Sequence, residues 1–248
     1  MTAASSRGVL TTPSVTAAAV ELADEVGLEA MTMRRLAQAL GVTPMALYKH
    51  VDNREKLIDL MVDQLVLEMA PELGEHDPAS AAPGANDPDV SADWRDALRE
   101  QILAARATMM SHPWSVEAIQ TRTLATPIVL AYMDRLMGIM FRGGLSADLV
   151  HHAMHTLSTR MWGFTQDVLP TPSASDAAAE SGGTLLSEEA ALVSFAASFP
   201  NIVRMAMTAP GAAGQCDADA EFGFALDILI DAFEQRRLSG WSSISVHS

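Results

Sequence analysis

Apolar residues recur every three to four positions along most of the chain, and this spacing predicts an all-α protein of about ten helices. Residues 12–70 divide into four closely spaced helices, because threonine precedes proline at Thr12 and Thr43, and Gly27 and Gly41 suit helix ends. No segment has the alternating pattern of a convincing strand. Further helices are predicted over residues 92–111, from Trp114, over 127–142 and 146–168, from Ser187 with an interruption at Pro200, and over 217–237.

Three segments fall outside this helical pattern. Residues 71–91 and 169–184 are rich in proline, glycine and small polar residues, which favour flexible loops. Residues 1–11 are expected to form a flexible arm, since they lack the apolar run of a signal peptide. No apolar run is long enough to predict a membrane span, so a cytoplasmic location is expected.

Charge is distributed unevenly along the chain. The 248 residues include 16 lysines and arginines against 31 aspartates and glutamates, which gives a formal charge of −15. Such acidity argues against general affinity for nucleic acid, because phosphate contacts need local positive charge. Residues 1–56, however, hold six basic and six acidic residues, so the whole acidic excess lies in residues 57–248. This asymmetry predicts two parts with different roles.

A helix-turn-helix pattern lies in the neutral part of the chain. Residues 33–40 form its first predicted helix, residues 41–43 the turn and residues 44–50 the second helix. The outward positions of the second helix combine apolar, hydroxyl and cationic side chains without an acid, which suits a helix that enters the major groove of DNA. The spacing alone also fits an ordinary three-helix cluster with a tight turn.

The run GLEAMTMRRLAQALGVTPMALYKHV over residues 27–51, with its continuation DNREKL, resembles the N-terminal DNA-binding domain of the TetR family of bacterial transcription regulators. The resemblance implies a helix-turn-helix domain of three helices over residues 12–56. It also implies a larger helical domain over residues 57–240 that binds a ligand and pairs two subunits. The DNA-contacting positions of the family fall on Thr32, Met33, Arg34, Thr43, Pro44, Met45, Ala46, Tyr48, Lys49 and Arg54.

The helix predicted over residues 146–168 has two usable faces, an apolar stripe and a second face with His151, His155 and Trp162. One face can pack within the subunit, and the other can pack against a partner or line a cavity. Together with the helix over 217–237, this helix can form an intersubunit four-helix bundle with two helices from each subunit. Plain core packing explains each apolar stripe at least as well. Methionine and aromatic side chains suit an apolar pocket, and the candidate ligand-binding residues are Met109, Trp114, Met133, Met137, His151, His155, Trp162 and Phe199.

Chemistry other than binding finds little support in the sequence. His151 and His155 have a spacing that allows them to share a metal ion, but no cysteine or obvious carboxylate completes the ligands, so no metal or cofactor is predicted. The lone Cys216 excludes a disulfide framework within the chain. No catalytic motif such as G-x-S-x-G or H-E-x-x-H occurs, so no catalytic residue is predicted.

The leading hypothesis is a ligand-responsive transcription regulator, and the family resemblance implies that it is a repressor. It would bind palindromic half-sites of double-stranded DNA as a homodimer and leave its operator when a largely apolar small molecule binds. The alternatives are an activator of the same family, a helical enzyme that binds a small molecule, and an adaptor that binds protein only.

Overall fold

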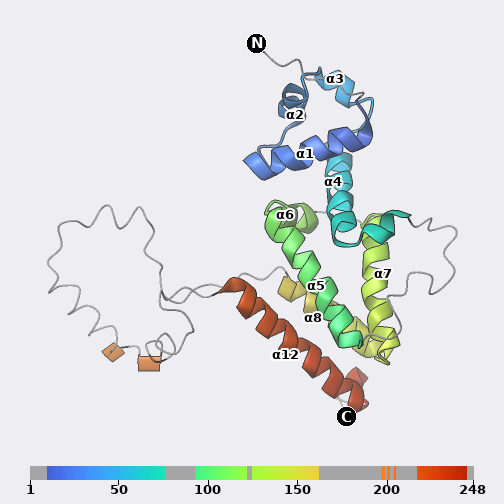
Figure 1. Cartoon of the computed structure of the whole chain (residues 1–248), viewed down its shortest axis with the longest axis vertical. Helices are drawn as coiled ribbons and strands as arrows, with labels where there is room; N and C mark the ends of the chain where they lie inside the picture. Colours follow the sequence, from blue (N-terminus) through green and yellow to red (C-terminus); the bar gives the residue numbers. More distant parts are fainter. Residues whose placement is uncertain are drawn as a thin grey trace. The chain divides into compact units, whose positions relative to one another are not determined.

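The computed structural model is built from helices (Figure 1). It describes residues 10–75, 93–121, 125–161 and 217–244, together with positions 197, 198, 200, 201 and 204. The elements whose bounds follow are nine α-helices and one 3-10 helix, and no described residue lies in a strand, which confirms the prediction of an all-α fold. The chain divides into two compact units, residues 1–162 with 230–248, and residues 163–229. The contacts described below lie in the first unit.

Four helices form the N-terminal part: α1 (Thr12–Val26), α2 (Met33–Ala39), α3 (Pro44–Leu47) and α4 (Arg54–Met69). The sequence Thr12-Pro13 predicts Thr12 as the cap of α1, and this was wrong by one residue. Thr11 caps this helix, because its hydroxyl accepts a hydrogen bond from the amide of Ser14 at 3.2 Å while its own amide donates to the Ser14 hydroxyl. Thr11 therefore belongs to the folded part and not to the flexible arm predicted over residues 1–11.

The other described elements are η1 (Pro71–Glu75), α5 (Trp94–Ser111), α6 (Ser115–Gln120), α7 (Pro127–Arg142), α8 (Ala147–Met161) and α12 (Ala218–Leu238). The bounds of α7 match the predicted helix over 127–142. The prediction of a flexible loop over 71–91 was wrong at the start of this segment, where η1 forms and its own residue Leu73 is buried. Residues 76–91 and 169–184, and the end of the helix predicted over 146–168, lie outside the described residues.

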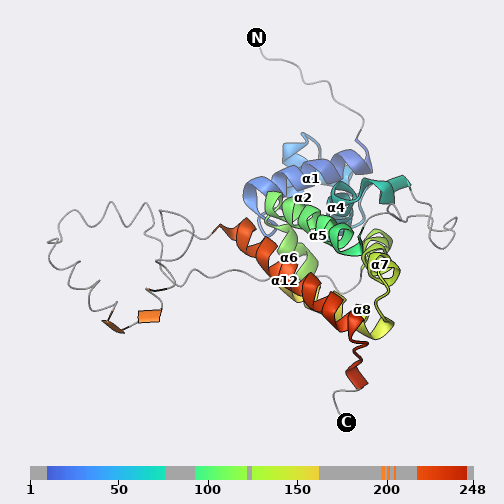
Figure 2. The ribbon, with the colours of Figure 1, turned by 60° about the horizontal axis from the view of Figure 1, so that its bottom comes forward.

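A single hydrophobic cluster joins the N-terminal helices to α6. Leu36, Leu47 and Met61 are fully buried in it, and Trp114 and Ala118 complete it from the start of α6. Helix α4 contacts α1, α5, α6 and α7, so it connects the N-terminal helices to the others (Figure 2). None of these contacts tests the domain boundary predicted between residues 56 and 57, which stays a prediction.

Gly143 lies against the indole of Trp94, at the end of α7. A Cβ added at Gly143 would come within 2.3 Å of Trp94 Cγ, and the rigid ring cannot make room for it. We expect Gly143→Ala to lower the free energy of unfolding by about 1–3 kcal/mol in a chemical denaturation experiment.

Gly138→Ala is the matched control for this substitution. A Cβ at Gly138 meets only the end of the Arg142 side chain, at 3.3 Å, and alanine favours a helix interior by up to about 1 kcal/mol over glycine. The two changes should therefore move the midpoint of denaturation in opposite directions. Equal midpoints would contradict the packing of Trp94 on Gly143.

Candidate nucleic-acid interface

The turn between α2 and α3 fixes how the two helices meet. Gly41 has a φ of +65°, a left-handed conformation that glycine adopts at little cost. Its amide donates to the carbonyl of Gln38 at 3.1 Å, and the amide of Val42 donates to the carbonyl of Ala37 at 2.9 Å. At the other end of α2, the hydroxyl of Thr32 accepts from the amide of Arg35 at 3.2 Å and caps the helix. The helix-turn-helix arrangement thus rests on local hydrogen bonds.

Helix α3 is a single turn held by one buried side chain, Leu47. The sequence predicts a helix up to residue 50, but a turn follows Leu47 instead. The amides of His50 and Val51 still bond to the carbonyl of Leu47, at 2.8 and 3.0 Å. The carbonyl of His50 in turn accepts from the hydroxyl of Thr12 at 3.1 Å, which ties this segment to the first turn of α1. No sequence signal predicts this tie, because the partners are 38 residues apart.

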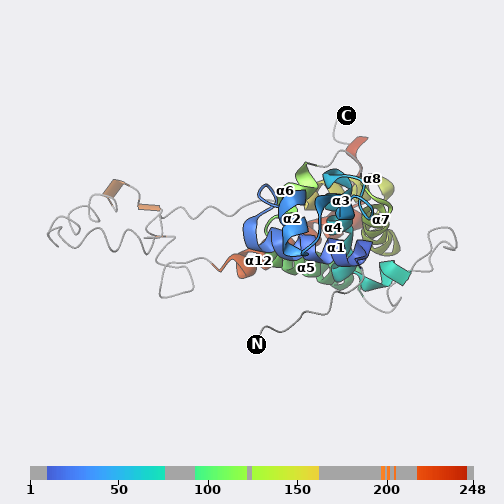
Figure 3. The same cartoon turned by 90° about the horizontal axis from the view of Figure 1, so that it is seen from above.

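The side chains on the other face of α3 and the following turn are turned to solvent. Met45 is 72% exposed and Tyr48 is 44% exposed, and Ala46 is half-buried. Thr43, Pro44 and Lys49 are exposed as well. The hydroxyl of Thr43 makes no capping hydrogen bond, so it is not used to start the helix. Figure 3 looks onto the side of the molecule where α2 and α3 lie.

This exposed face is cationic in a chain that is otherwise acidic. Residues 31–51 contain no aspartate or glutamate, while Arg34, Arg35 and Lys49 lie within them and are exposed. Local positive charge is what contact with the phosphate backbone requires. Apolar groups such as Met45 suit contact with thymine methyl groups, and an arginine such as Arg34 suits guanine or phosphate. The arrangement can therefore meet both the backbone and the base edges of a duplex.

Two of the ten predicted DNA-contacting residues have other surroundings. Met33 is only 9% exposed and belongs to the hydrophobic cluster. The guanidinium of Arg54 donates to the carbonyls of Leu28 at 2.7 Å and Met31 at 3.4 Å, so it holds the loop between α1 and α2. Both side chains support the fold here, and we leave them out of the interface that we propose below.

The predicted ligand-binding residues have varied surroundings. Met109 is buried, Met137 is half-buried and Met133 is 40% exposed, so the methionines of α7 do not share one kind of environment. Trp162 and Phe199 lie outside the described residues. The part of these residues in ligand binding stays a prediction.

The two faces of α8 differ in burial. Val150 and Leu157 are buried, whereas His151, His155 and Ser158 are exposed. The rings of His151 and His155 lie edge to face with their centroids 4.6 Å apart. No group of three or more histidine, cysteine, aspartate or glutamate side chains is placed to hold a metal ion in the part of the chain that the structure describes.

Trp114 has a polar contact that the sequence does not predict. Its indole N–H donates to Asp24 Oδ1 at 2.6 Å, across 90 residues of sequence. The side chain is 5% exposed and lies in the cluster with the N-terminal helices. The structure therefore places Trp114 where α6 meets α1.

A buried phenol lies between α5 and α7. The hydroxyl of Tyr132 donates to the carbonyl of Gln101 at 3.2 Å. Burial raises the pKa of Tyr132 to about 12, because the ionised phenolate would lose its hydration there.

Among the described helices, none is both long enough and apolar enough to cross a membrane.

Comparison with known proteins decides the family. The model described as "Bacterial regulatory proteins, tetR family" matches residues 15–61, and the model described as "Tetracyclin repressor-like, C-terminal domain" matches residues 87–237. The chain belongs to the tetR family of bacterial regulatory proteins. The tetR family match confirms the resemblance seen in residues 27–57. It also favours a regulator over the enzyme considered as an alternative.

Individual tetR family relatives match to different extents. The repressor DrrR1 of Streptomyces coeruleorubidus is 31% identical over 137 residues, which are 55% of this chain and 46% of DrrR1. A transcriptional regulator of Saccharopolyspora erythraea is 29% identical over 57% of this chain and 54% of its own length, so the chain spans about half the length of these two relatives. The class A tetracycline repressor of Escherichia coli is 29% identical over 91% of both chains.

Two solved structures similar to this chain contain a small molecule or DNA. ActR of Streptomyces coelicolor in complex with (S)-DNPA has 25% identity and a TM-score of 0.63, and the match covers 94% of this chain and all of ActR. BioQ with its double-stranded DNA operator has 26% identity and a TM-score of 0.50, and the match covers 63% of this chain and 86% of BioQ.

Proposed function

We propose that this chain is a transcription regulator that binds a DNA operator and responds to a small-molecule effector. The observation that carries the proposal is the exposed, acid-free face of α3 with its flanking cations. The proposed DNA contacts of the chain are eight of the ten residues predicted from sequence: Thr32, Arg34, Thr43, Pro44, Met45, Ala46, Tyr48 and Lys49. Regulation would take place in the cytoplasm, where the DNA is.

A homodimer is the form we propose for DNA binding. One α3 can contact only a few bases, while two copies related by a two-fold axis reach palindromic half-sites about one helical turn apart. The exposed face of α8 with His151 and His155, together with α12, is the proposed pairing surface. Residues 12–56 would then serve DNA binding, and residues 57–240 would serve pairing and effector binding.

Repression is the proposed sense of regulation, and effector binding would relieve it. DrrR1 and the class A tetracycline repressor are both named repressors, and ActR has been solved with a small molecule bound. An effector can shift the protein away from its operator only if it binds the form that does not fit DNA more tightly. The effector itself we propose to be largely apolar.

A mobility-shift experiment on the DNA upstream of the gene tests DNA binding. We expect a shift with micromolar dimer at low salt, and an affinity that falls steeply as salt rises. The absence of any shift on this DNA at low salt would refute the proposed function.

Lys49→Ala should weaken binding to all duplexes by about tenfold at low salt, because the lysine of each subunit no longer binds a phosphate. The negative slope of log affinity against log salt should become less steep by about one for each phosphate that the variant leaves unbound. Arg142→Ala, at the far end of α7, is the control and should leave both quantities unchanged. An unchanged salt slope for Lys49→Ala would rule out its proposed contact with phosphate.

A further inference from the structure

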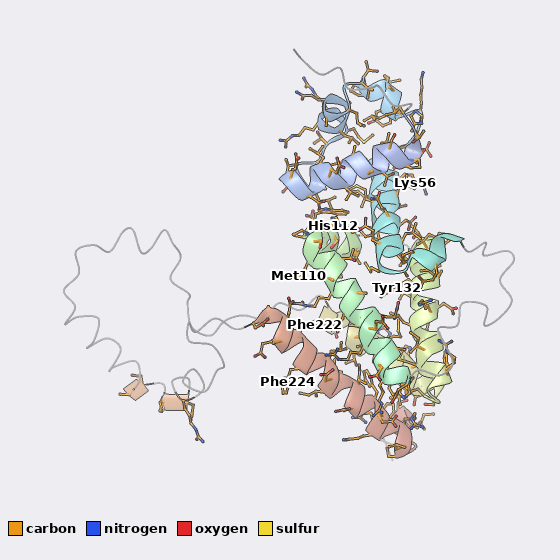
Figure 4. The ribbon with its side chains drawn as sticks, viewed as in Figure 1. Lys56, Met110, His112, Tyr132, Phe222 and Phe224 are labelled. Carbon is orange, nitrogen blue, oxygen red and sulfur yellow. The ribbon has the colours of Figure 1, made fainter. Side chains whose placement is uncertain are left out.

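A polar junction joins three segments where the loop between α5 and α6 meets the N-terminal helices. Asp24 lies in the last turn of α1, Glu68 in the last turn of α4, and His112 and Trp114 in the loop. Figure 4 labels His112 close beneath α1. We call these four side chains the α1 junction.

Asp24 is the acceptor at the centre of the α1 junction. Its Oδ1 receives the indole N–H of Trp114 at 2.6 Å, and its two oxygens lie 2.8 and 3.0 Å from His112 Nδ1. The carboxylate can only accept, so Nδ1 of His112 is the donor in this contact. The other nitrogen, Nε2, lies 3.4 Å from Glu68 Oε2. One carboxylate thus binds α1 to the loop through two donors that belong to a different part of the sequence.

Helix α1 connects the α1 junction to α3, the helix proposed to contact the bases; we call the two α3 helices of a dimer the reading helices. The helix has 15 residues and is therefore about 22 Å long. Asp24 fixes its last turn to the loop, while Thr12 in its first turn bonds to the carbonyl of His50 directly after α3. A tilt of a few degrees at the Asp24 end displaces the Thr12 end by about 1–2 Å, because a helix moves as a rigid rod over this length.

Displacements of this size matter for a dimer on DNA. The two α3 helices must enter adjacent major grooves, and one base pair changes the separation of half-sites by about 3.4 Å and turns one half-site about the duplex axis by about 35° relative to the other. Contacts that fix the tilt of α1 therefore also fix the distance between the two reading helices of the dimer.

We propose that Asp24 is a positioning residue that sets which spacing of half-sites the dimer accepts. The proposal rests on the proposed function, since it needs a dimer on a palindromic operator. Asp24 touches no DNA; it acts through α1, by holding the N-terminal helices to the loop that begins α6.

The test compares duplexes that carry the operator found by footprinting, with the two half-sites moved apart or together by one or two base pairs. Wild-type protein is expected to lose at least about tenfold in affinity for each base pair of altered spacing. Asp24→Asn removes the charge and one of the two acceptor oxygens with little change of shape, and the loss should shrink to about threefold or less. Its affinity for a single half-site should stay within about twofold of the wild type, because the reading surface is unchanged.

Two further variants keep the test decisive if Asp24→Asn folds poorly. Trp114→Phe removes the indole N–H but leaves an aromatic ring in the cluster, and it should relax the spacing preference in the same sense. Glu25→Gln changes the same charge on the adjacent residue of α1, which is exposed like Asp24 but lies outside the α1 junction, and it should behave as the wild type.

Three results would overturn the role given to Asp24. One is a wild-type spacing profile in both Asp24→Asn and Trp114→Phe. Another is an equal loss of affinity for single and paired half-sites, which would mark Asp24 as important for folding alone. The third, a wild-type protein that binds no duplex, refutes the proposed function itself and this role with it.

Discussion

Leu47→Ala is expected to lower the free energy of unfolding by about 2–5 kcal/mol and to abolish specific DNA binding. Leu47 is fully buried and is the one buried side chain of α3. A helix of one turn has no stability of its own, because nucleation costs more than its few hydrogen bonds return. The position of α3 therefore depends on this side chain. Total stabilities of about 5–15 kcal/mol make the loss a large fraction of the whole.

Chemical denaturation measures the first effect and a mobility shift at a temperature where the variant remains folded measures the second. Met45→Ala is the matched control two residues earlier, because Met45 is 72% exposed and its removal should change stability by less than about 0.5 kcal/mol. A denaturation midpoint for Leu47→Ala equal to that of Met45→Ala would show that Leu47 does not hold α3.

The second large effect is a loss of stability at alkaline pH that depends on Tyr132. Unfolded tyrosine ionises near pH 10, while burial raises the pKa of Tyr132 to about 12 in the folded chain. Its contribution to stability is complete below pH 10 and declines as pH rises from 10 to 12, since the unfolded state releases its proton first. The decline amounts to about 3 kcal/mol over these two units.

Urea denaturation at intervals between pH 9 and 12 follows this decline. Tyr132→Phe should remove it, although the variant starts about 1 kcal/mol lower at neutral pH because the hydrogen bond to Gln101 is lost. Tyr48→Phe changes the other, exposed tyrosine and should retain the wild-type slope. The same slope in Tyr132→Phe and in the wild type would assign the alkaline loss to other groups.

Sequence reasoning predicts the long helices well and the short ones less well. The apolar stripe of residues 127–142 and the proline at its start reproduce the bounds of α7. The pattern over residues 44–50 overestimates α3, because a segment held by Leu47 alone gives no periodic signal to mark its end. Residues 71–75 look like a linker in sequence, yet Leu73 finds a buried place there.

The same limit applies to the candidate DNA interface. The exposed face with Met45, Tyr48 and Lys49 follows from the pattern, since these positions surround the one apolar residue that must turn inward. Position in a motif does not reveal which side chains are already engaged, and so the motif places Met33 and Arg54 among the DNA contacts. The contact of Asp24 with Trp114 joins residues too distant in sequence for any local pattern to predict.

The place of Trp114 in the N-terminal cluster also has a consequence for the growing polypeptide. Helices α1 to α4 leave the ribosome well before Trp114 and Ala118, the two residues that close their core. At about 5–20 residues per second, the nascent helices wait for seconds with part of their apolar surface uncovered. A chain still in synthesis therefore lacks a complete N-terminal core until α6 has been made, and a truncated product of translation would not compete with the complete protein for DNA.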